Sequence, residues 1–427
     1  METGRNLLVG IDLGSRITQI NYFDFTSYEP IAAGRNCAGE RIYEIPTSLL
    51  FEPASGEWFW GDEEHPKKDN LVCFSDFLED VSREEYLEGS NYRIATYEIL
   101  KRFLVKVLSI LKEYEPAQKI RKLVITVEKK EKRLTEYLLQ IGEELGIPKG
   151  GVVVCNHRQS YMYYAISQPK ELWLNNVGMF ELEGDRLTYS QINIDRKTEP
   201  YIIGVTQKDL SDDIEWQKLA EENEEQIAYA FLNAANTVLY KQLVTTIYIT
   251  GSGFEAPWAN EALQKLCAGR RVFRGQNLFT KGACYAAREL SGEGKLDYCL
   301  FLDEEMIASN VSIRLYHDAA MQDVLLAKAG TLWADVDCSV DVIPDDEDEI
   351  QIIIQDVLKH ETRAHMLSLS GFAGRKNKMT RFTIRLRFAD RNTCIVTLKD
   401  NGFGEFCPSS NRVWERYIKL EGSTWEN

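Results

Sequence analysis

The feature that most constrains this chain is a pattern that occurs twice. An apolar strand ends in a glycine turn, a second strand follows, and helices then alternate with strands, once from residue 7 and again from residue 177. Apolar residues recur at helical spacing in three long segments, 93–114, 132–145 and 215–243. Short apolar runs between and after them, at 122–127, 151–155 and 246–250, have the length and composition of buried strands. The repeat predicts two related α/β lobes.

The pattern changes at about residue 291. Beyond it there is almost no segment of helical periodicity, and short alternating runs such as 311–316 and 382–388 are separated by turn residues. We therefore expect an all-β, sandwich-like domain over 304–427 after an α/β domain at 1–290. Residues 291–303 join the two, and their apolar run fits either an interdomain linker or the first strand of the next domain. The α/β domain is divided into lobe I, about 1–170, and lobe II, about 171–290.

Charge and composition exclude several classes of function. The 427 residues carry a formal net charge of -16, and such an acidic surface repels phosphate backbones, so we expect no nucleic-acid partner. The nine cysteines form no CxxC pair and several lie in apolar runs, which is typical of reduced cysteines in a cytoplasmic protein. No secretory signal pattern and no apolar run long enough to span a membrane is present, so we expect a cytoplasmic protein.

Glycine-containing turns are the candidate sites for chemistry. Gly10-Ile11-Asp12-Leu13-Gly14-Ser15 follows the first strand, and Thr250-Gly251-Ser252-Gly253-Phe254 follows a later one. Glycines let backbone N–H groups approach phosphate oxygens, and a carboxylate such as Asp12 can hold Mg²⁺ through water. A third candidate is the single Gly178. Each turn by itself also fits an ordinary connection between structural elements.

The order of these motifs is more specific than any one of them. GIDLGS, IPTSLLF, WGDEE, KLVITV, VVVCNHRQS, VGMFEL, IYITGSGFE and NLFTKGACYAA follow one another as in the DnaK-type (heat-shock-protein-70-like) chaperones and their relative actin. The chain resembles a reduced, divergent member of that superfamily. The resemblance implies a two-lobed actin-like (ribonuclease H-like) ATPase fold. It also implies ATP or ADP with Mg²⁺ as candidate ligands of Asp12 and the glycine turns, that is, of Gly10, Asp12, Leu13, Gly14, Ser15, Arg16, Gly178, Gly251, Ser252, Gly253 and Phe254.

Departures from the family pattern weaken the expected chemistry. The second phosphate turn lacks the family's first aspartate and keeps only Gly178, and the position of the catalytic lysine falls on His65, with Lys67 and Lys68 nearby. The glutamate of the family's NEP motif is replaced by His157 or by Gln159. Gln159 is a candidate catalytic residue because a glutamine can orient an attacking water, although it can equally cap a helix. We expect at most a weak ATPase.

Three functions remain in competition. The first is a DnaK-like protein that binds a protein or peptide partner through its β domain, with or without gating by ATP. The alternative is a non-hydrolysing actin-like scaffold or assembly protein, for which residues 411–427 are either a docking tail or a final strand. A small-molecule kinase would need a catalytic aspartate that the sequence does not offer. The acidic run 345–349 fits a solvated turn better than a calcium loop.

Overall fold

The computed structural model describes residues 6–37, 39–63, 71–89, 91–197, 199–213, 224–345, 349–368 and 378–420. The chain divides into two compact units. The first comprises Met1–Gln191 and Gln207–Asp297, and the second comprises Ile192–Thr206 and Tyr298–Asn427. Helices and strands occur together in the first unit, so the predicted mixed α/β class is confirmed.

The first sheet has the order β13-β12-β1-β2-β3, with β6 also paired to β2. Its strands are β1 (Leu7–Leu13), β2 (Ile17–Asp24), β3 (Glu29–Ala32), β6 (Ile45–Pro46), β12 (Ile120–Val127) and β13 (Val152–Asn156). β1 runs antiparallel to β2 and parallel to β12, and β12 runs parallel to β13. Parallel neighbours need a crossover, which the helix α3 (Lys132–Glu144) supplies between β12 and β13.

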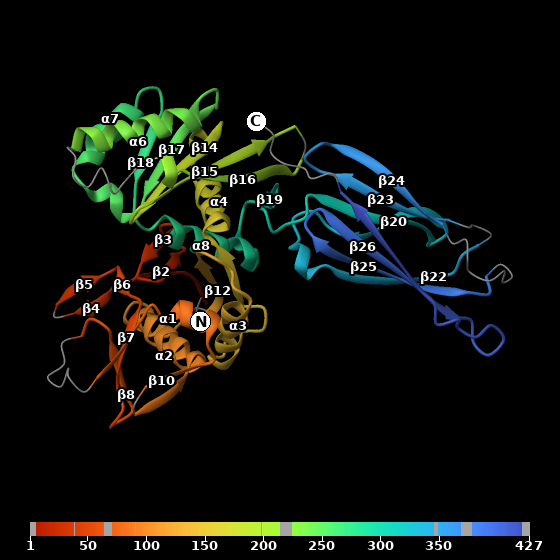
Figure 1. Ribbon diagram of the computed structural model, residues 1–427, viewed down its shortest axis with the longest axis horizontal. Coiled ribbons are helices and arrows are strands. Elements are labelled where there is room, and N and C mark those ends of the chain that lie inside the picture. The colour runs from red at the N-terminus through yellow and green to blue at the C-terminus, as the bar shows by residue number, and fades with distance from the viewer. Residues whose placement is uncertain are drawn as a thin grey trace. The chain divides into compact units, whose positions relative to one another are not determined.

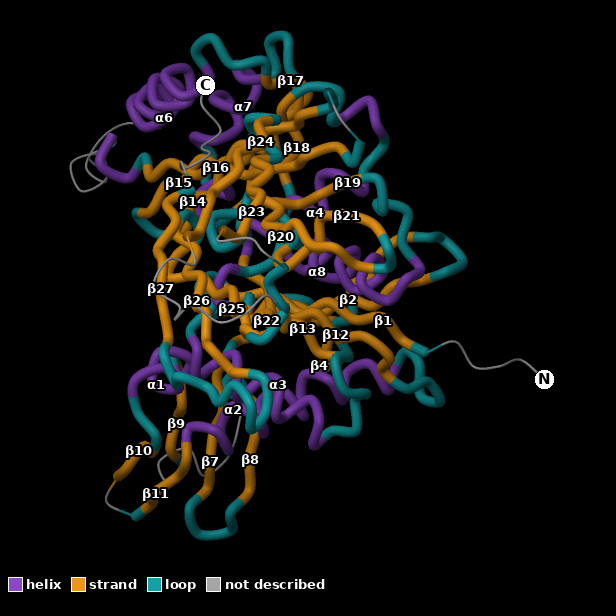
Figure 2. The backbone as a smooth tube through the Cα atoms, turned by 90° about the vertical axis from the view of Figure 1, so that its right-hand side faces the viewer, coloured by secondary structure: helices purple, strands orange, loops and turns teal. Residues whose placement is uncertain are grey.

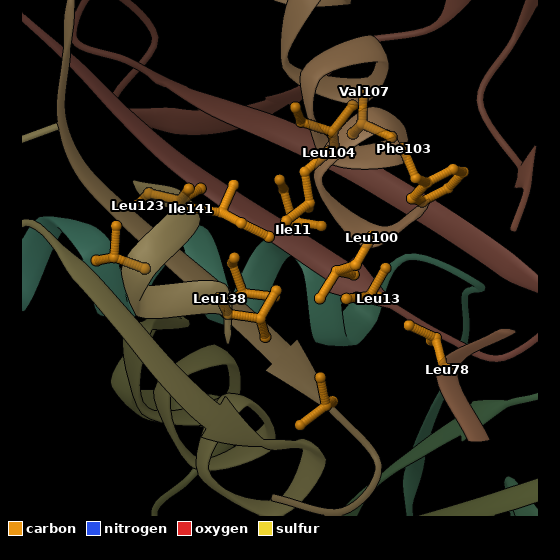
Figure 3. Packing of buried hydrophobic residues seen from close by; sticks show 14 of the residues in the cluster. Ile11, Leu13, Leu78, Leu100, Phe103, Leu104, Val107, Leu123, Leu138 and Ile141 are labelled. Carbon is orange, nitrogen blue, oxygen red and sulfur yellow. The ribbon is translucent and has the colours of Figure 1, made fainter. Parts of the chain in front are cut away.

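One face of this sheet is covered by α1 (Phe77–Arg83), α2 (Thr96–Ser109) and α3, and the hydrophobic core of the lobe lies between them. Figure 3 shows Ile11 and Leu13 of β1 in the same cluster as Leu100, Phe103 and Leu104 of α2. Alternate residues of a strand point to opposite faces, so Gly10 and Asp12 must face away from this core. The sequence pattern of β1 therefore assigns one face to packing and leaves the other for the site.

The second sheet repeats the arrangement of the first. Its order is β18-β17-β14-β15-β16-β19. Its strands are β14 (Asn176–Glu183), β15 (Arg186–Asp195), β16 (Tyr201–Asp209), β17 (Val244–Thr250), β18 (Arg271–Arg274) and β19 (Cys299–Leu302). β14 runs parallel to β17, as β1 does to β12. Phe180 of β14 packs with Phe231 of α6 (Glu224–Leu239) and with Phe254, beside α7 (Trp258–Leu266).

The helix predicted over 215–243 ends earlier than expected. α6 ends at Leu239, because Lys241 has a φ of 59°, a left-handed conformation that cannot continue a helix, and β17 begins at Val244. Residues 214–223, the first part of the predicted helix, lie outside the described residues.

Two helices, α4 (His157–Ser167) and α8 (Leu278–Arg288), lie between the sheet of β1 and the strands β14 and β17 (Figure 1). They cross closely at Gly282, where an added Cβ would lie 2.0 Å from the backbone oxygen of Ser160. α8 also lies against β1, where a Cβ on Gly10 would be 2.3 Å from the backbone nitrogen of Cys284. The small residues of α8 therefore permit helix and sheet backbones to approach.

Residues between β3 and β12 form smaller sheets. They consist of β4 (Arg35–Cys37) with β5 (Glu40–Ile42), β7 (Ser48–Glu52) with β8 (Glu57–Trp60) and β9 (Val72–Ser75), and β10 (Tyr86–Gly89) with β11 (Tyr92–Ala95). The strands β7 to β11 lie together beside α1 and α2 (Figure 2). The strands β7 and β8 form a hairpin, with Gly56 at a φ of 75° in its turn.

The second unit contains two four-stranded antiparallel sheets that share one core. The first has the order β21-β20-β23-β24 and the second β22-β25-β26-β27. The strands are β20 (Ser309–His317), β21 (Ala320–Ala327), β22 (Asp337–Val342), β23 (Glu349–Asp356), β24 (Glu361–Ser368), β25 (Arg381–Asp390), β26 (Thr393–Gly402) and β27 (Val413–Lys419). Val311 and Ile352 from the first sheet pack with Ile384, Leu386 and Val396 from the second.

The predicted linker 291–303 contains structure. Cys299–Leu302 forms β19, which pairs in parallel with Tyr201–Gly204 of β16, and Leu302 packs against Ile202. Burial in a sheet explains the apolar composition of this run better than an exposed connection does. Within the other predicted segment, 411–427, Val413–Lys419 is strand β27, and residues 421–427 lie outside the described residues. So do 346–348 of the acidic run.

Candidate functional site

Asp12 lies at the end of β1, on the face that carries Gly10 and points toward α8. Its carboxylate accepts a hydrogen bond from the Nε2–H of His157 at 2.9 Å. Both side chains are mostly buried, with 16% of Asp12 and 18% of His157 exposed. His157 is the first residue of α4, and its ring stacks on Phe279 of α8, with ring centroids 4.0 Å apart and planes 7° apart. The ends of β1, α4 and α8 therefore meet at one ion pair.

His157 is held in its charged form. Burial by itself lowers its pKa, but the Asp12 carboxylate outweighs burial, and Glu181 and Glu128 act in the same direction, so the pKa rises to about 8. Glu181 is subject to the opposite balance, because burial raises the pKa of its carboxyl more than His157 lowers it. The Asp12–His157 pair therefore feels two further carboxyl groups, of which Glu128 is itself paired with Arg186.

Glu181 occupies in the second hairpin the position that Asp12 occupies in the first. Asp12 of β1 pairs with Thr126 of the parallel strand β12, and Glu181 of β14 pairs with Thr250 of the parallel strand β17. The resemblance places the family's second phosphate turn around Gly178 and finds no counterpart of its first aspartate there, whereas the hairpin of 177–194 is expected to turn at Glu183-Gly184-Asp185. An alignment of Glu181-Leu182-Glu183-Gly184 with Asp12-Leu13-Gly14 would have identified Glu181 from the sequence.

Gly178 lies inside β14 and not in a turn. The turn between β14 and β15 is at Gly184, where φ is 59°, six residues further along. A Cβ on Gly178 would lie 3.0 Å from the ring of Tyr189 and 3.3 Å from Val244. Packing against these side chains accounts for the glycine, and its contact with phosphate stays a prediction.

The first glycine turn is tight and partly exposed. The N–H of Gly14 donates to the carbonyl of Ile17 at 3.1 Å, which closes the hairpin. Leu13 is buried in the core, whereas Ser15 and Arg16 are exposed, and the carbonyl of Arg16 accepts a hydrogen bond from the N–H of Thr47. Of the six residues expected here, Asp12 is the one that the structure brings into a cluster of charged side chains.

The turn Gly251-Ser252-Gly253 is filled by side chains of this chain. The carboxylate of Glu183 accepts hydrogen bonds from the Ser252 N–H and from its hydroxyl, both at 2.9 Å. Gln276 accepts from the Gly251 N–H at 3.0 Å and donates to its carbonyl at 3.2 Å. Both glycines pack against Leu182. The Phe254 side chain is fully buried among the aromatic residues of the second sheet's core, and its contact with a nucleotide stays a prediction.

Gln159 caps helix α4. Its side chain accepts a hydrogen bond from the N–H of Asn156 at 3.0 Å, while its own N–H donates to the Asn156 side chain at 2.9 Å. This reciprocal capping box satisfies two groups at the helix start. The alternative that Gln159 caps a helix is thus correct, and the catalytic assignment is not supported. His65, Lys67 and Lys68 lie outside the described residues.

A pocket of about 520 Å³ opens beside this cluster, on the side of β2 and β3. It is lined by Gln19, Ile20 and Asn21 of β2, Ala32 of β3, Tyr43 and Glu44 after β5, and Gln276 and Asn277 before α8. Gln19 pairs across the sheet with Asp12, and its side chain accepts a hydrogen bond from the Thr280 hydroxyl at 2.9 Å. Gln19 therefore connects the pocket to the Asp12–His157 pair within the first unit.

Comparison with protein families identifies the chain. Residues 34–304 match the model described as "Family of unknown function (DUF5716) C-terminal". The chain belongs to this family. In this DUF5716 protein the match covers Glu181, Glu183, His157 and the pocket residues from Gly34 onward, whereas Asp12 precedes it. Residues 306–420, which include all the strands from β20 to β27, match a second model, "Domain of unknown function (DUF8552)".

No curated protein matches the chain. Across the described ranges, no helix is both long and apolar enough to cross a bilayer. Within those same ranges, no three His, Cys, Asp or Glu side chains are grouped so that they could hold a metal ion.

Proposed function

We propose that this DUF5716 protein is a non-hydrolysing, actin-like (ribonuclease H-like) protein that binds a protein or peptide partner and does not turn over ATP. The repeated arrangement supports the fold: each of two sheets has a hairpin beside a parallel strand, and α4 and α8 lie between them. The acidic residues Asp12 and Glu181 take equivalent positions in the two hairpins. Because such a fold supports many functions, the site must carry the functional argument.

The Asp12–His157 pair is the observation that carries the proposal. In a nucleotide site of this kind Asp12 would hold the water shell of Mg²⁺, whereas here it already pairs with a charged imidazole at 2.9 Å. A Mg²⁺ ion at the same carboxylate would be repelled by the charged imidazole that already contacts Asp12 Oδ1 and stacks on Phe279. The residues present therefore do not fit Mg²⁺ bound to a triphosphate.

The surrounding turns add to the same argument. Phosphoryl transfer depends on positioning and on cations that stabilise negative charge. The Glu183 carboxylate already accepts the hydrogen bond of the Ser252 N–H, a group that would otherwise meet phosphate, and Glu128 forms an ion pair with Arg186. Negative side chains at these positions repel phosphate, so both binding and hydrolysis are disfavoured.

The second unit supports the partner-binding half of the proposal. β21 is an edge strand whose Met321 and Leu325 are exposed, next to the exposed Tyr316 of β20. An exposed strand edge with apolar side chains can add a strand from a peptide or from another protein. Gating of that binding by ATP is the second candidate, and it requires a nucleotide that the first unit recognises.

The test is thermal unfolding of the full chain without nucleotide, with millimolar Mg-ATP and with millimolar Mg-ADP, together with a phosphate-release assay. A ligand that binds only the folded state raises the melting temperature, with about 2.7 kcal/mol of stabilisation at a hundredfold excess over Kd. We expect no shift and no phosphate release above buffer. A shift, or release that Asp12→Ala abolishes, would overturn the proposal, and a shift without release would favour the ATP-gated candidate.

A further inference from the structure

Strand β27 is an edge strand of the second sheet of the sandwich. Among the described residues it pairs with β26 alone, at the end of the order β22-β25-β26-β27 (Figure 2). The strand is seven residues long, and five of its side chains are exposed. An edge strand of this length presents its free backbone groups to solvent, where another extended chain can pair with them.

The direction of the backbone hydrogen bonds shows which residues of β27 face that free edge. At one end the carbonyl of Arg412 accepts from the N–H of Asp400, and at the other the N–H of Leu420 donates to the carbonyl of Asn392. The register between these two points is regular. In an antiparallel pair, successive residues turn their N–H and C=O groups alternately to the two sides. The outward groups therefore belong to Val413, Glu415, Tyr417 and Lys419.

The side chains along this edge carry excess positive charge. Arg416 and Lys419 of β27 and Lys399 of β26 are exposed, and none of the three forms an ion pair with a described residue. Glu415 is the acidic side chain of β27, and its carboxylate accepts a hydrogen bond from the hydroxyl of Tyr417 at 2.9 Å. Three cations and one carboxylate thus lie on the end of this sheet.

This local charge is opposite to that of the chain as a whole. Residues 378–420 contain nine Lys or Arg and four Asp or Glu, whereas the 427 residues together carry a net charge of -16. The edge strand β21 of the other sheet contains Asp323 and no cation. Charge complementarity therefore favours an acidic partner at β27 in particular.

The same charges argue against two other occupants of the edge. A second copy of β27 would bring Arg416 and Lys419 of both chains together, and like charges across a pair of strands are destabilising. A nucleic acid would meet the cations, but it has no row of N–H and C=O groups with the spacing of a strand. A long polyanion is also repelled by the acidic chain as a whole.

We propose that the edge of β27 binds an extended acidic segment of a partner protein, which adds to the second sheet as a further strand. Its backbone pairs with the outward groups of β27, and its carboxylates face Arg416 and Lys419, with Lys399 one strand further in. Val413 and Tyr417, 57% and 63% exposed, add apolar contact. The inference goes beyond the proposed function, which draws on the edge of β21 and does not specify the partner's charge.

Fluorescence anisotropy with the full chain tests this, with a labelled peptide of glutamate and valine that has the seven-residue length of β27. We expect saturable binding that weakens about tenfold when sodium chloride rises from about 0.05 to about 0.5 M, because salt screens exposed charges. A peptide with lysine in place of glutamate should not bind. A peptide with the same glutamates but proline in place of valine should bind about tenfold more weakly, since proline lacks the N–H donor.

Two substitutions place the site on β27. Arg416→Gln and Lys419→Gln each remove one charge from an exposed side chain, so each should weaken binding about threefold, within the range of an exposed ion pair. Lys328→Gln is the matched control, because Lys328 is an exposed cation that directly follows β21 of the other sheet. Its affinity should equal that of the wild type.

Four outcomes would overturn the inference. The glutamate peptide does not bind at millimolar concentration, the proline peptide binds as tightly as the valine peptide, or Arg416→Gln and Lys419→Gln both bind like the wild type. In the fourth, a single-stranded oligonucleotide of the same charge binds more tightly than the peptide, which would make the edge a nucleic-acid site. None of these results involves nucleotide turnover or the edge of β21, so the proposed function would stand.

Discussion

At the residue scale, the Asp12–His157 pair sets a pH dependence of folding. The pKa of His157 is raised from 6.5 to about 8 in the folded chain, so the folded state binds a proton that the unfolded state releases more easily. The stabilisation is fully present below pH 6.5 and is lost as the pH rises through about 8. A shift of this size corresponds to about 2 kcal/mol.

Urea unfolding of the wild type and of His157→Gln at pH 6 and pH 9 measures this contribution. The stability difference between the two proteins should be about 2 kcal/mol larger at pH 6 than at pH 9. His317→Gln is the control, because His317 is exposed at the end of β20. Equal differences at the two pH values would show that Asp12 does not hold the imidazole in its charged form.

The residue scale also shows where sequence reasoning about the site succeeded and where it did not. Asp12 was found because it stands in a glycine turn directly after an apolar strand. Glu181 was missed because a strand register, not a motif, makes it equivalent to Asp12. The pairing with His157 joins positions 145 residues apart, and no local pattern encodes such a distance.

At the element scale, α4 and α8 approach each other closely at Gly282 and Ser160. Gly282 is buried within α8, and an added Cβ would meet the backbone of Ser160 at 2.0 Å, where no side chain can move aside. Overpacking of this kind destabilises by about 1–3 kcal/mol. The same helix carries Phe279 and Thr280, so its displacement would disturb the site as well.

Gly282→Ala should therefore lower the midpoint of urea unfolding, measured by circular dichroism. Gly275→Ala is the matched control, because Gly275 has an ordinary φ and nothing lies within 4 Å of an added Cβ. Its midpoint should change little. A Gly282→Ala protein as stable as Gly275→Ala would mean that the two helices do not cross at this point.

Elements were predictable where one periodicity dominates. α2 and α3 have long amphipathic patterns and were found within a few residues of their bounds. The polar and acidic composition of residues 62–90 predicts a surface loop, but the described part of this stretch contains β9, α1 and β10, with Phe77 and Val81 buried. That expectation was wrong because a seven-residue helix has too few turns to show a period in the sequence.

At the scale of the whole molecule, the two units have separate cores, so we expect them to unfold separately. Cys155 and Cys284 are buried in the first unit and Cys394 in the second, and burial raises the pKa of Cys155 to about 11 and that of Cys394 to about 12. Thiolates are the reactive form, so these three residues should resist alkylation in the folded chain. The exposed Cys37, Cys73 and Cys267 should react.

Alkylation with iodoacetamide at increasing urea, read by peptide mass spectrometry, follows both units in one sample. Cys284 and Cys394 should become reactive at different urea concentrations, since different cores protect them. The exposed cysteines serve as internal controls and should be modified throughout. Coincident exposure of Cys284 and Cys394 would show that the chain unfolds as one cooperative body.

The sequence by itself determined the elements whose pattern is local: the repeated hairpins, the amphipathic helices and the change to strands after residue 291. These follow from periodicity and turn chemistry, which depend on neighbouring residues. Only the tertiary structure decided the site. The pairing of Asp12 with His157, the closing of the Ser252 turn by Glu183, and the gathering of Gln19, Asn21 and Asn277 at one pocket depend on strand register and on the approach of α8. These contacts join residues far apart in the sequence, so they form only when the cores pack.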